Sequence, residues 1–206
     1  MRIIIEGWRS LPHSYGVIDQ FLSLELWGRG DVELFHRYVP FFDASVRTGA
    51  DTLGDEGFAA RLARVPTARV EQEADTTVRI FVPLDLTPAA SKRTLVFATS
   101  EFAIFDANQI GRSSIAALNA DAGIVCVTPS QWSRSGLVRC GADPGQVVVI
   151  PHGIDPEVFR PVGAALREDL RRRLGWTGHF LFLNVGALTG NKGTIDLLKA
   201  GHLPQR

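Results

Sequence analysis

Hydrophobic residues follow two periods along this chain, and the pattern switches repeatedly from one to the other. Short apolar runs are typical of strands, and longer segments with apolar residues three and four positions apart are typical of helices. The expected strands lie at 2–6, 31–39, 77–83, 94–99, 123–128, 146–150 and 179–185. The expected helices lie at 15–28, 58–64, 109–120, 130–139 and 162–174, and a further helix starts after the last strand.

Several expected strands are apolar at every position rather than at every second one, as residues 147–150 illustrate. This is typical of strands that are buried on both faces, which occur in parallel sheets covered by helices. The sequence therefore predicts an α/β fold, a Rossmann-like parallel sheet with helices on both faces. Residues 40–75 are less regular, and their glycines and aspartates predict loops apart from the short helix at 58–64, which Pro66 ends.

The composition excludes several classes of function. The 206 residues include 22 basic and 22 acidic side chains, so the basic excess of a nucleic-acid-binding protein is missing. No apolar run approaches the roughly 20 residues that span a bilayer. The N-terminal MRIIIEGW lacks a signal-peptide pattern, which predicts a cytoplasmic protein. Cys126 and Cys140 lack the close spacing of a metal site and are expected to be core thiols. We expect no metal ion and no cofactor.

Ligands of an open parallel sheet bind beyond the carboxyl ends of the strands, so the residues after each strand are the functional candidates. The first such corner is EGWRSLPHSYGVIDQ. His13, Ser14, Tyr15 and Gly16 lie where the next helix begins, and free N–H groups at a helix N-terminus favour an anion. Ser14 could equally serve only as the helix cap. The fingerprint G-x-G-x-x-G is absent, which disfavours a nicotinamide dehydrogenase.

The second corner, PHGID, follows the expected strand at 146–150. Pro151 has no N–H and ends the strand, and Gly153 is expected to let the backbone turn. His152 and Asp155 could then face a ligand cleft. Alternatively, Asp155 and the proline after it could form a turn that starts a short helix.

The third corner, NVGALTGNKGTIDLL, comes close to the phosphate-binding loop G-x-x-x-x-G-K-[ST] but does not match it. Counted from Gly186, the second required glycine falls on Asn191, and Gly193 stands where Ser or Thr would hold a metal ion. This disfavours ATP hydrolysis. Lys192 and the helix N-terminus still suit a ligand that contains a diphosphate. The alternative is that Lys192 is simply an exposed loop residue.

Three segments taken together resemble the retaining family-4 glycosyltransferases of the GT-B fold. VTPSQWSRSGLVRCGADPGQVVVIPHGIDPEVFRP resembles the signature near the interdomain linker, and FLNVGALTGNKGTIDLLKA resembles the start of the donor-binding domain. GWRSLPHSYGVIDQFLSLELWGRG resembles the acceptor-side first loop of one subgroup. The resemblance covers residues 1 to about 200, and no single segment would be specific alone.

The resemblance implies a nucleotide-activated sugar donor, a glycan or lipid-linked acceptor and transfer with retention. Lys192 matches the family's diphosphate-binding lysine, with Gly186 and Gly193 at the turn, whereas Ala187 stands where many members carry an arginine. The acceptor side of the cleft would be formed by His13, Ser14, Tyr15, Gly16, Ser130, His152, Gly153 and Asp155. The sequence assigns no catalytic residue.

The resemblance also predicts how the chain divides. Residues 1–160 would form the acceptor-side domain, and residues 161–206 a crossover helix and the first βα unit of an incomplete donor-binding domain. The family's acidic pair, Glu-x7-Glu, has no place in this sequence, so most of the donor pocket would be missing and the truncated chain would be inactive alone. A partner protein or an oligomer could cover the incomplete part.

Three functions remain open from the sequence. The first is a glycosyltransferase that needs the rest of a donor domain, and it predicts no turnover by this chain alone. The second is a non-catalytic module that binds a glycan or a partner protein, and it predicts saturable binding without chemistry. The third, an unrelated Rossmann-like nucleotide-binding protein, is the weakest, because the expected fingerprints are missing from both glycine-containing corners.

Overall fold

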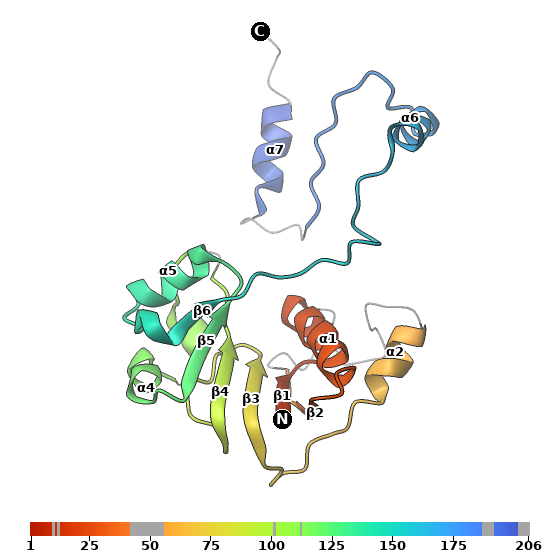
Figure 1. Ribbon diagram of the computed structural model, residues 1–206. Coiled ribbons are helices and arrows are strands. Elements are labelled where there is room, and N and C mark those ends of the chain that lie inside the picture. The colour runs from red at the N-terminus through yellow and green to blue at the C-terminus, as the bar shows by residue number, and fades with distance from the viewer. Residues whose placement is uncertain are drawn as a thin grey trace. The chain divides into compact units, whose positions relative to one another are not determined.

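A sheet of six strands forms the centre of residues 1–153 in the computed structural model (Figure 1). The order across the sheet is β2-β1-β3-β4-β5-β6, and every neighbouring pair is parallel. The strands are β1 (Arg2–Gly7), β2 (Glu33–Tyr38), β3 (Ala74–Ile80), β4 (Ser91–Phe97), β5 (Ile124–Thr128) and β6 (Val147–Val149). The predicted α/β fold with a parallel sheet is therefore confirmed.

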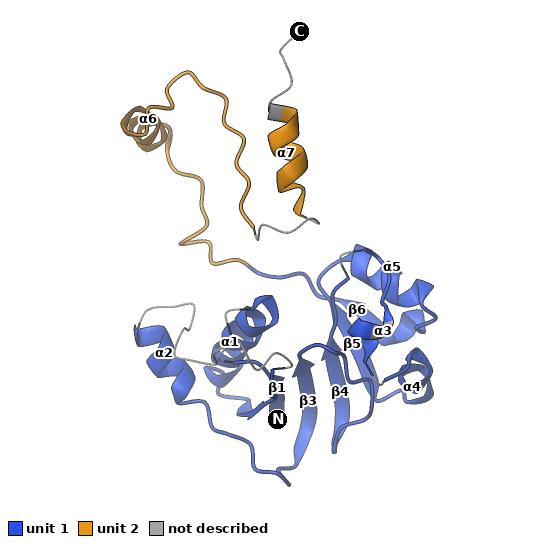
Figure 2. Cartoon of the chain, turned by 180° about the vertical axis from the view of Figure 1, so that it is seen from behind, with its two compact units in different colours: residues 1–153 blue, residues 154–206 orange. Residues whose placement is uncertain are grey.

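The structure describes residues 1–9, 11, 13–41, 56–100, 102–111, 113–186 and 192–201. The chain separates into two compact units, Met1–Gly153 and Ile154–Arg206 (Figure 2). The domain division expected at residue 160 stays a prediction. The loops expected between residues 42 and 55 lie outside the described residues.

The sheet has an apolar core on each face. Val96 and Phe97 are neighbours on β4 and point to opposite faces, and each belongs to a different core cluster. Phe97 packs in the cluster that includes Leu24 and Leu62 from the first two helices, and Val96 packs in the cluster that includes Leu137. Helices therefore cover both faces, as predicted (Figure 1). The helices of this unit are α1 (Ser14–Trp27), α2 (Glu56–Ala63), α3 (Ala107–Ile110), α4 (Ile115–Ala120), α5 (Gln131–Arg139) and the short 3-10 helix η1 (Pro144–Gln146).

The two cysteines belong to the second core cluster, on the face that α5 covers. Cys126 is fully buried on β5, and Cys140 packs against the cluster from the end of α5. Burial raises the pKa of the Cys126 thiol to about 12, so this side chain stays protonated. The expectation that Cys126 is a core thiol is confirmed.

The helix expected at 109–120 is interrupted. α3 ends at Ile110, and Gly111 has a φ of 64°, a left-handed conformation that a right-handed helix cannot contain. A new helix, α4, then begins at Ile115, where the Ser114 side chain accepts a hydrogen bond from the Ala117 amide. The apolar period continues across the break, which is why the sequence predicted one helix.

The unit formed by residues 154–206 contains α6 (Ala164–Arg173) and α7 (Thr194–Gly201). The strand expected at 179–185 is not formed, although Figure 1 shows an extended segment between the two helices. A strand needs hydrogen bonds to a second strand, and none lies beside this segment in the described part of the unit. Among the described residues, no helix is long and apolar enough to cross a membrane.

Candidate functional site

The strand order reverses between β1 and β3. β1 leads to β2 on one side, and β3 returns to pair with β1 on the other side. Gly7 and Ile80 end these two strands and lie opposite each other in the register. In parallel sheets, ligands bind outside the carboxyl ends of strands at such a reversal. The loop after β1 is therefore a candidate for a ligand site.

Two glycines allow α1 to begin close to this loop. A Cβ atom on Gly16 would overlap the carbonyl oxygen of Leu11 and would lie 2.9 Å from that of Trp8. A Cβ atom on Gly7 would overlap the Asp19 carboxylate and lie 2.9 Å from the Ile80 carbonyl oxygen. The sequence placed Gly16 among the site residues, but in the structure it allows close approach of the protein's own backbone.

His13 caps α1, and Ser14 does not. The backbone of His13 is extended, and its Nδ1 accepts a hydrogen bond from the Tyr15 amide at 3.2 Å. Ser14 is the first helical residue and its side chain is exposed, so the alternative that Ser14 serves as the helix cap is wrong. Because Nδ1 accepts a hydrogen bond, the neutral His13 ring carries its proton on Nε2. Burial lowers the pKa of His13, which favours this neutral form.

Tyr15 connects the start of α1 to the end of β4. Its hydroxyl oxygen accepts a hydrogen bond from the Thr99 amide at 3.2 Å and lies 3.3 Å from the Thr99 hydroxyl oxygen. Burial raises the pKa of Tyr15, so the phenol remains protonated. Tyr15 thus fixes the loop after β1 to a strand end that lies 84 residues later in the sequence.

A row of aromatic rings joins the first two predicted corners. The ring of His13 lies 5.9 Å from that of Tyr15, Tyr15 lies 5.2 Å from Phe97, and Phe97 lies 5.6 Å from His152. His152 is exposed at one end of the row, and His13 is half-buried at the other. The structure therefore brings together residues that the sequence singled out in two separate corners, and Phe97 is the contact between Tyr15 and His152.

The sequence did not single out Phe97, which belongs to this row, or Trp8, which packs beside it. Trp8 lies 5.3 Å from the His13 ring, edge to face, and is buried. Both follow the rule that functional groups gather at the carboxyl ends of strands, since Phe97 ends β4 and Trp8 follows β1. That signal was available, but large apolar side chains at strand ends are usually part of a core.

Of three other predicted residues, two have local structural roles and Gly153 has none. Ser130 caps α5, where its hydroxyl oxygen accepts a hydrogen bond from the Ser133 amide at 3.2 Å. Gly153 has no positive φ, and a Cβ atom there would meet nothing within 4 Å, so the expected need for glycine is wrong. Asp155, in the second unit, accepts from the Glu157 amide at 2.9 Å, which is the turn that the sequence left as an alternative.

A buried polar pair holds α1 against β2, and the sequence did not predict it. The two carboxylate oxygens of Asp19 lie 3.0 and 2.9 Å from His36 Nε2, and the Ser23 hydroxyl donates to Asp19 at 3.0 Å. Asp19 and His36 are 0% and 2% exposed. Burial lowers the pKa of the nearby Arg9, while the Asp19 carboxylate opposes that effect. The pair fixes the position of the helix whose N-terminus borders the site.

The predicted diphosphate-binding residues lie in the second unit. Lys192 Cγ is 3.9 Å from the position that a Cβ atom on Gly186 would occupy, so the two ends of the glycine-containing loop approach each other. Gly193 has a φ of 66°, and its carbonyl oxygen accepts the Leu197 amide at 2.9 Å in the first turn of α7. Lys192 therefore stands directly before a helix N-terminus. Ala187 and Asn191 lie outside the described residues.

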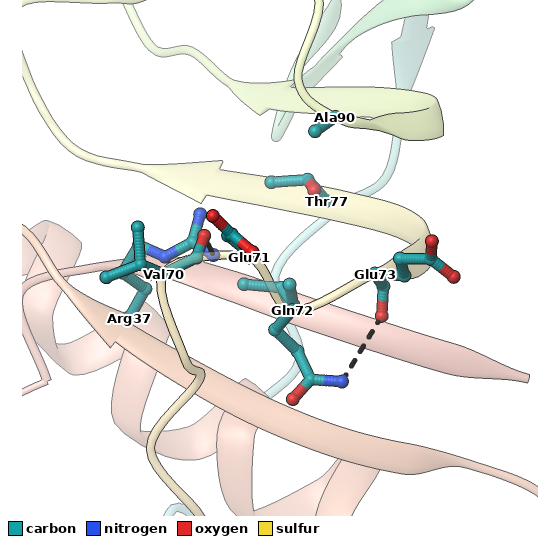
Figure 3. Close-up of a pocket in the computed structure, with 8 residues that line it drawn as sticks. Arg37, Val70, Glu71, Gln72, Glu73, Thr77 and Ala90 are labelled. Atoms are coloured by element: carbon teal, nitrogen blue, oxygen red, sulfur yellow. Dashed lines mark hydrogen bonds between the residues drawn. The ribbon is translucent and has the colours of Figure 1, made fainter.

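A crevice of about 300 Å³ lies on the face of the sheet below residues 70–73, away from the carboxyl ends of the strands (Figure 3). Arg37, on its wall, bonds to Glu6 at 2.6 Å and donates to the Arg69 carbonyl oxygen at 3.1 Å. These bonds attach the segment between α2 and β3 to the sheet and give Arg37 a structural role. Within the described parts of the chain, no group of three or more His, Cys, Asp or Glu residues is arranged to hold a metal ion.

No protein-family model matches this chain, and no curated protein matches it. The chain is similar in structure to crystal structures of Anabaena HepE in complex with UDP (TM-score 0.58, 13% identity), with UDP-glucose (0.55, 12%) and with UDP and glucose (0.53, 14%). In each comparison, 97% of this chain is covered. The chain spans 57–58% of the length of those structures. At this level of identity, the likeness establishes a shared fold.

Proposed function

We propose that this chain is the acceptor-side part of a nucleotide-sugar-dependent glycosyltransferase of the GT-B type, together with the beginning of its donor side. The observation that carries the proposal is the likeness to HepE over 97% of the chain, because those structures contain UDP, UDP-glucose, or UDP and glucose. UDP and UDP-glucose are therefore the first donors to test.

The acceptor would bind at the row of rings. His13, Tyr15, Phe97 and His152 line the carboxyl edge of the sheet, and the exposed face of His152 can stack against the apolar face of a sugar ring. The neutral His13 ring offers an Nε2–H donor to a sugar hydroxyl. Tyr15 would hold the strand end in position through Thr99 rather than take part in the chemistry.

The donor diphosphate would bind before α7. Lys192 supplies a full positive charge, and the first backbone amides of the helix supply uncharged hydrogen-bond donors. In a transfer with retention, the diphosphate leaves on the face of the sugar that the acceptor attacks. The role of Lys192 is then to stabilise the negative charge that develops on the leaving group. No residue of the chain is assigned as a catalytic base.

The test measures UDP binding by calorimetry with the wild-type chain and two variants. Lys192→Ala should weaken binding about tenfold or more, since a charge-assisted hydrogen bond contributes about 1.5–3 kcal/mol. Lys199→Ala is the matched control, because it removes an exposed lysine from the last turn of the same helix. No binding of UDP or UDP-glucose by the wild type, or an equal loss in both variants, would refute the donor site.

Turnover separates this proposal from the second candidate, a non-catalytic module that binds a glycan. The exposed His152 ring against Phe97 favours that alternative. We expect no glucose transfer by the chain alone, because it spans 57–58% of the HepE chains. Measurable transfer by the isolated chain would contradict that expectation. Glycan binding that His152→Ala abolishes, with no UDP binding, would favour the binding module.

A further inference from the structure

Half of one face of the sheet, over β1, β2 and β3, carries polar side chains. Partners in the parallel register lie on the same face, so Glu6 shares this face with Arg37 and Arg79, and Ile4 shares it with Thr77. None of these residues belongs to either core cluster. The described residues of α1 and α2 pack in the core of the opposite face, and those of α4 and α5 pack in the core over β4–β6. The faces of parallel sheets are normally apolar and covered by helices, so this polar half-face is suited to a ligand.

The crevice of about 300 Å³ lies on this polar half-face, and Thr77 of β3 is a buried polar group in its lining. Thr77 is 3% exposed, and its hydroxyl forms no hydrogen bond with any described residue. Figure 3 shows Thr77 between Ala90 and the segment that carries Glu71 and Gln72. A buried hydroxyl without a protein partner is destabilising unless another molecule satisfies it, so this one is available to a ligand in the crevice.

The charges around the crevice leave two carboxylates over. Glu6 is shared by two cations, since one of its oxygens lies 2.6 Å from Arg37 and the other lies 3.0 Å from Arg79. The carboxylates of Glu71 and Glu73 form no ion pair with any described residue. Figure 3 shows these two side chains toward opposite ends of the crevice, with Thr77 between them. A ligand would therefore meet a negative charge at each end and a hydroxyl group in the middle.

The lining excludes two common ligand classes. Two separated carboxylates do not supply the six or more oxygen atoms that surround Ca²⁺ or Mg²⁺. A sugar ring would have no aromatic side chain to stack on, because none of the described residues that line the crevice is aromatic. Ile4, Val70 and Ala90 add apolar surface to the lining, which suits an aliphatic chain.

We propose that this crevice binds a linear aliphatic polyamine. Its terminal ammonium groups would lie at Glu71 and Glu73, and an inner N–H group would donate a hydrogen bond to the Thr77 hydroxyl oxygen. The aliphatic segments between the nitrogen atoms would contact Ile4 and Ala90. This inference does not depend on the proposed sugar chemistry.

Calorimetry with the full-length chain measures the binding of spermidine, which has one inner amine, and of an unbranched diamine of the same length, which has none. Glu71→Gln and Glu73→Gln should each weaken the binding of both amines about two- to fivefold, as expected for exposed ion pairs. Thr77→Val should weaken spermidine binding about three- to tenfold and leave the binding of the diamine unchanged. Glu25→Gln is the control, because Glu25 is an exposed carboxylate on α1, which packs on the opposite face.

Urea denaturation separates a binding role of Thr77 from a structural one. Thr77→Val should not lower the free energy of unfolding, because the hydroxyl has no protein partner and valine suits a strand. Five results would overturn the proposal: no spermidine binding by the wild type, an equal loss of binding in Glu25→Gln and Glu73→Gln, unchanged spermidine binding in Thr77→Val, a loss in Thr77→Val that the diamine shares, or a destabilised Thr77→Val variant.

Discussion

At the scale of single residues, His13 shows how one side chain can serve both the fold and the site. Its Nδ1 caps α1 by accepting the Tyr15 amide, and its ring packs edge to face with Trp8. These contacts need the neutral imidazole, since a protonated Nδ1 cannot accept a hydrogen bond. The capping contact thus also determines which ring nitrogen, Nε2, remains available to a ligand.

The first prediction concerns the pH dependence of stability. Burial lowers the pKa of His13 in the folded chain below its unfolded value of about 6.5. The unfolded chain then binds the proton more readily, so the contribution of His13 is fully present above about pH 6.5 and is lost as the pH falls through the folded pKa. His13→Asn keeps a capping side chain without this titration.

Urea denaturation at several pH values measures this effect. Below about pH 6.5, the free energy of unfolding should fall more steeply for the wild type than for His13→Asn. His13→Ala should cost about 1 kcal/mol at neutral pH, because it removes the cap altogether. Identical pH profiles for the wild type and His13→Asn would mean that His13 is not the titrating group.

At the scale of elements, α1 is the helix that positions the site, and it is held at two points. Its N-terminus is fitted against the loop through Gly16, and its middle is bonded to β2 through Asp19 and His36. A buried carboxylate without a partner would be strongly destabilising, and here both its oxygens approach the imidazole while Ser23 donates to one of them. The loop after β1 is therefore set by contacts on both sides of the helix start.

The second prediction tests the fit of α1 against the loop. Gly16→Ala should destabilise the protein by about 1–3 kcal/mol, because the new methyl group meets backbone oxygens that cannot move alone. Helix propensity alone predicts the opposite, a gain of about 1 kcal/mol. Gly30→Ala is the control, since a Cβ atom there meets nothing within 4 Å. Denaturation curves in which Gly16→Ala is as stable as Gly30→Ala would contradict the close approach.

At the scale of the whole molecule, the hydrophobic core lies within the first unit. Every buried member of the two core clusters lies between Ile3 and Val147, and both clusters pack on the one sheet. In the second unit, the described residues include exposed apolar side chains such as Phe180 and Leu183. The first unit therefore has a hydrophobic core of its own, which is what a domain needs to fold alone.

The third prediction follows from the position of the core. A fragment of residues 1–153 should unfold cooperatively, with a free energy in the range of about 5–15 kcal/mol found for ordinary domains. A fragment of residues 1–143 should be less stable by at least about 3 kcal/mol. It loses β6, the buried Val147 and Gln146, whose side-chain amide donates to the carbonyl oxygens of Leu118, Asp121 and Ile124.

Circular dichroism during denaturation measures both fragments. Loss of cooperative unfolding in the longer fragment would show that residues 154–206 are needed for the first unit. Equal stability of the two fragments would show that β6 does not contribute to the core.

The sequence by itself determined the α/β class, the parallel sheet and the core of most strands. The local pattern of apolar residues carries this information, since a strand such as β5 is apolar because both its faces are covered. The sequence also indicated α2 and its end before Pro66. It placed His13 and Tyr15 where a helix begins and His152 after a strand, which is where the structure has them.

Only the tertiary structure decided which of these residues meet. Phe97 connects Tyr15 to His152 because the sheet order brings distant strand ends together, and no local pattern encodes that order. Asp19 pairs with His36 because α1 packs against β2. Gly111 divides a continuous apolar period because its φ of 64° is left-handed, and a Cβ atom at this position would lie 2.6 Å from Pro83 Cβ. Residues 179–185 have the composition of a strand but do not form one in this chain. Composition gives the tendency to pair, but a strand exists only where a second strand supplies its hydrogen bonds.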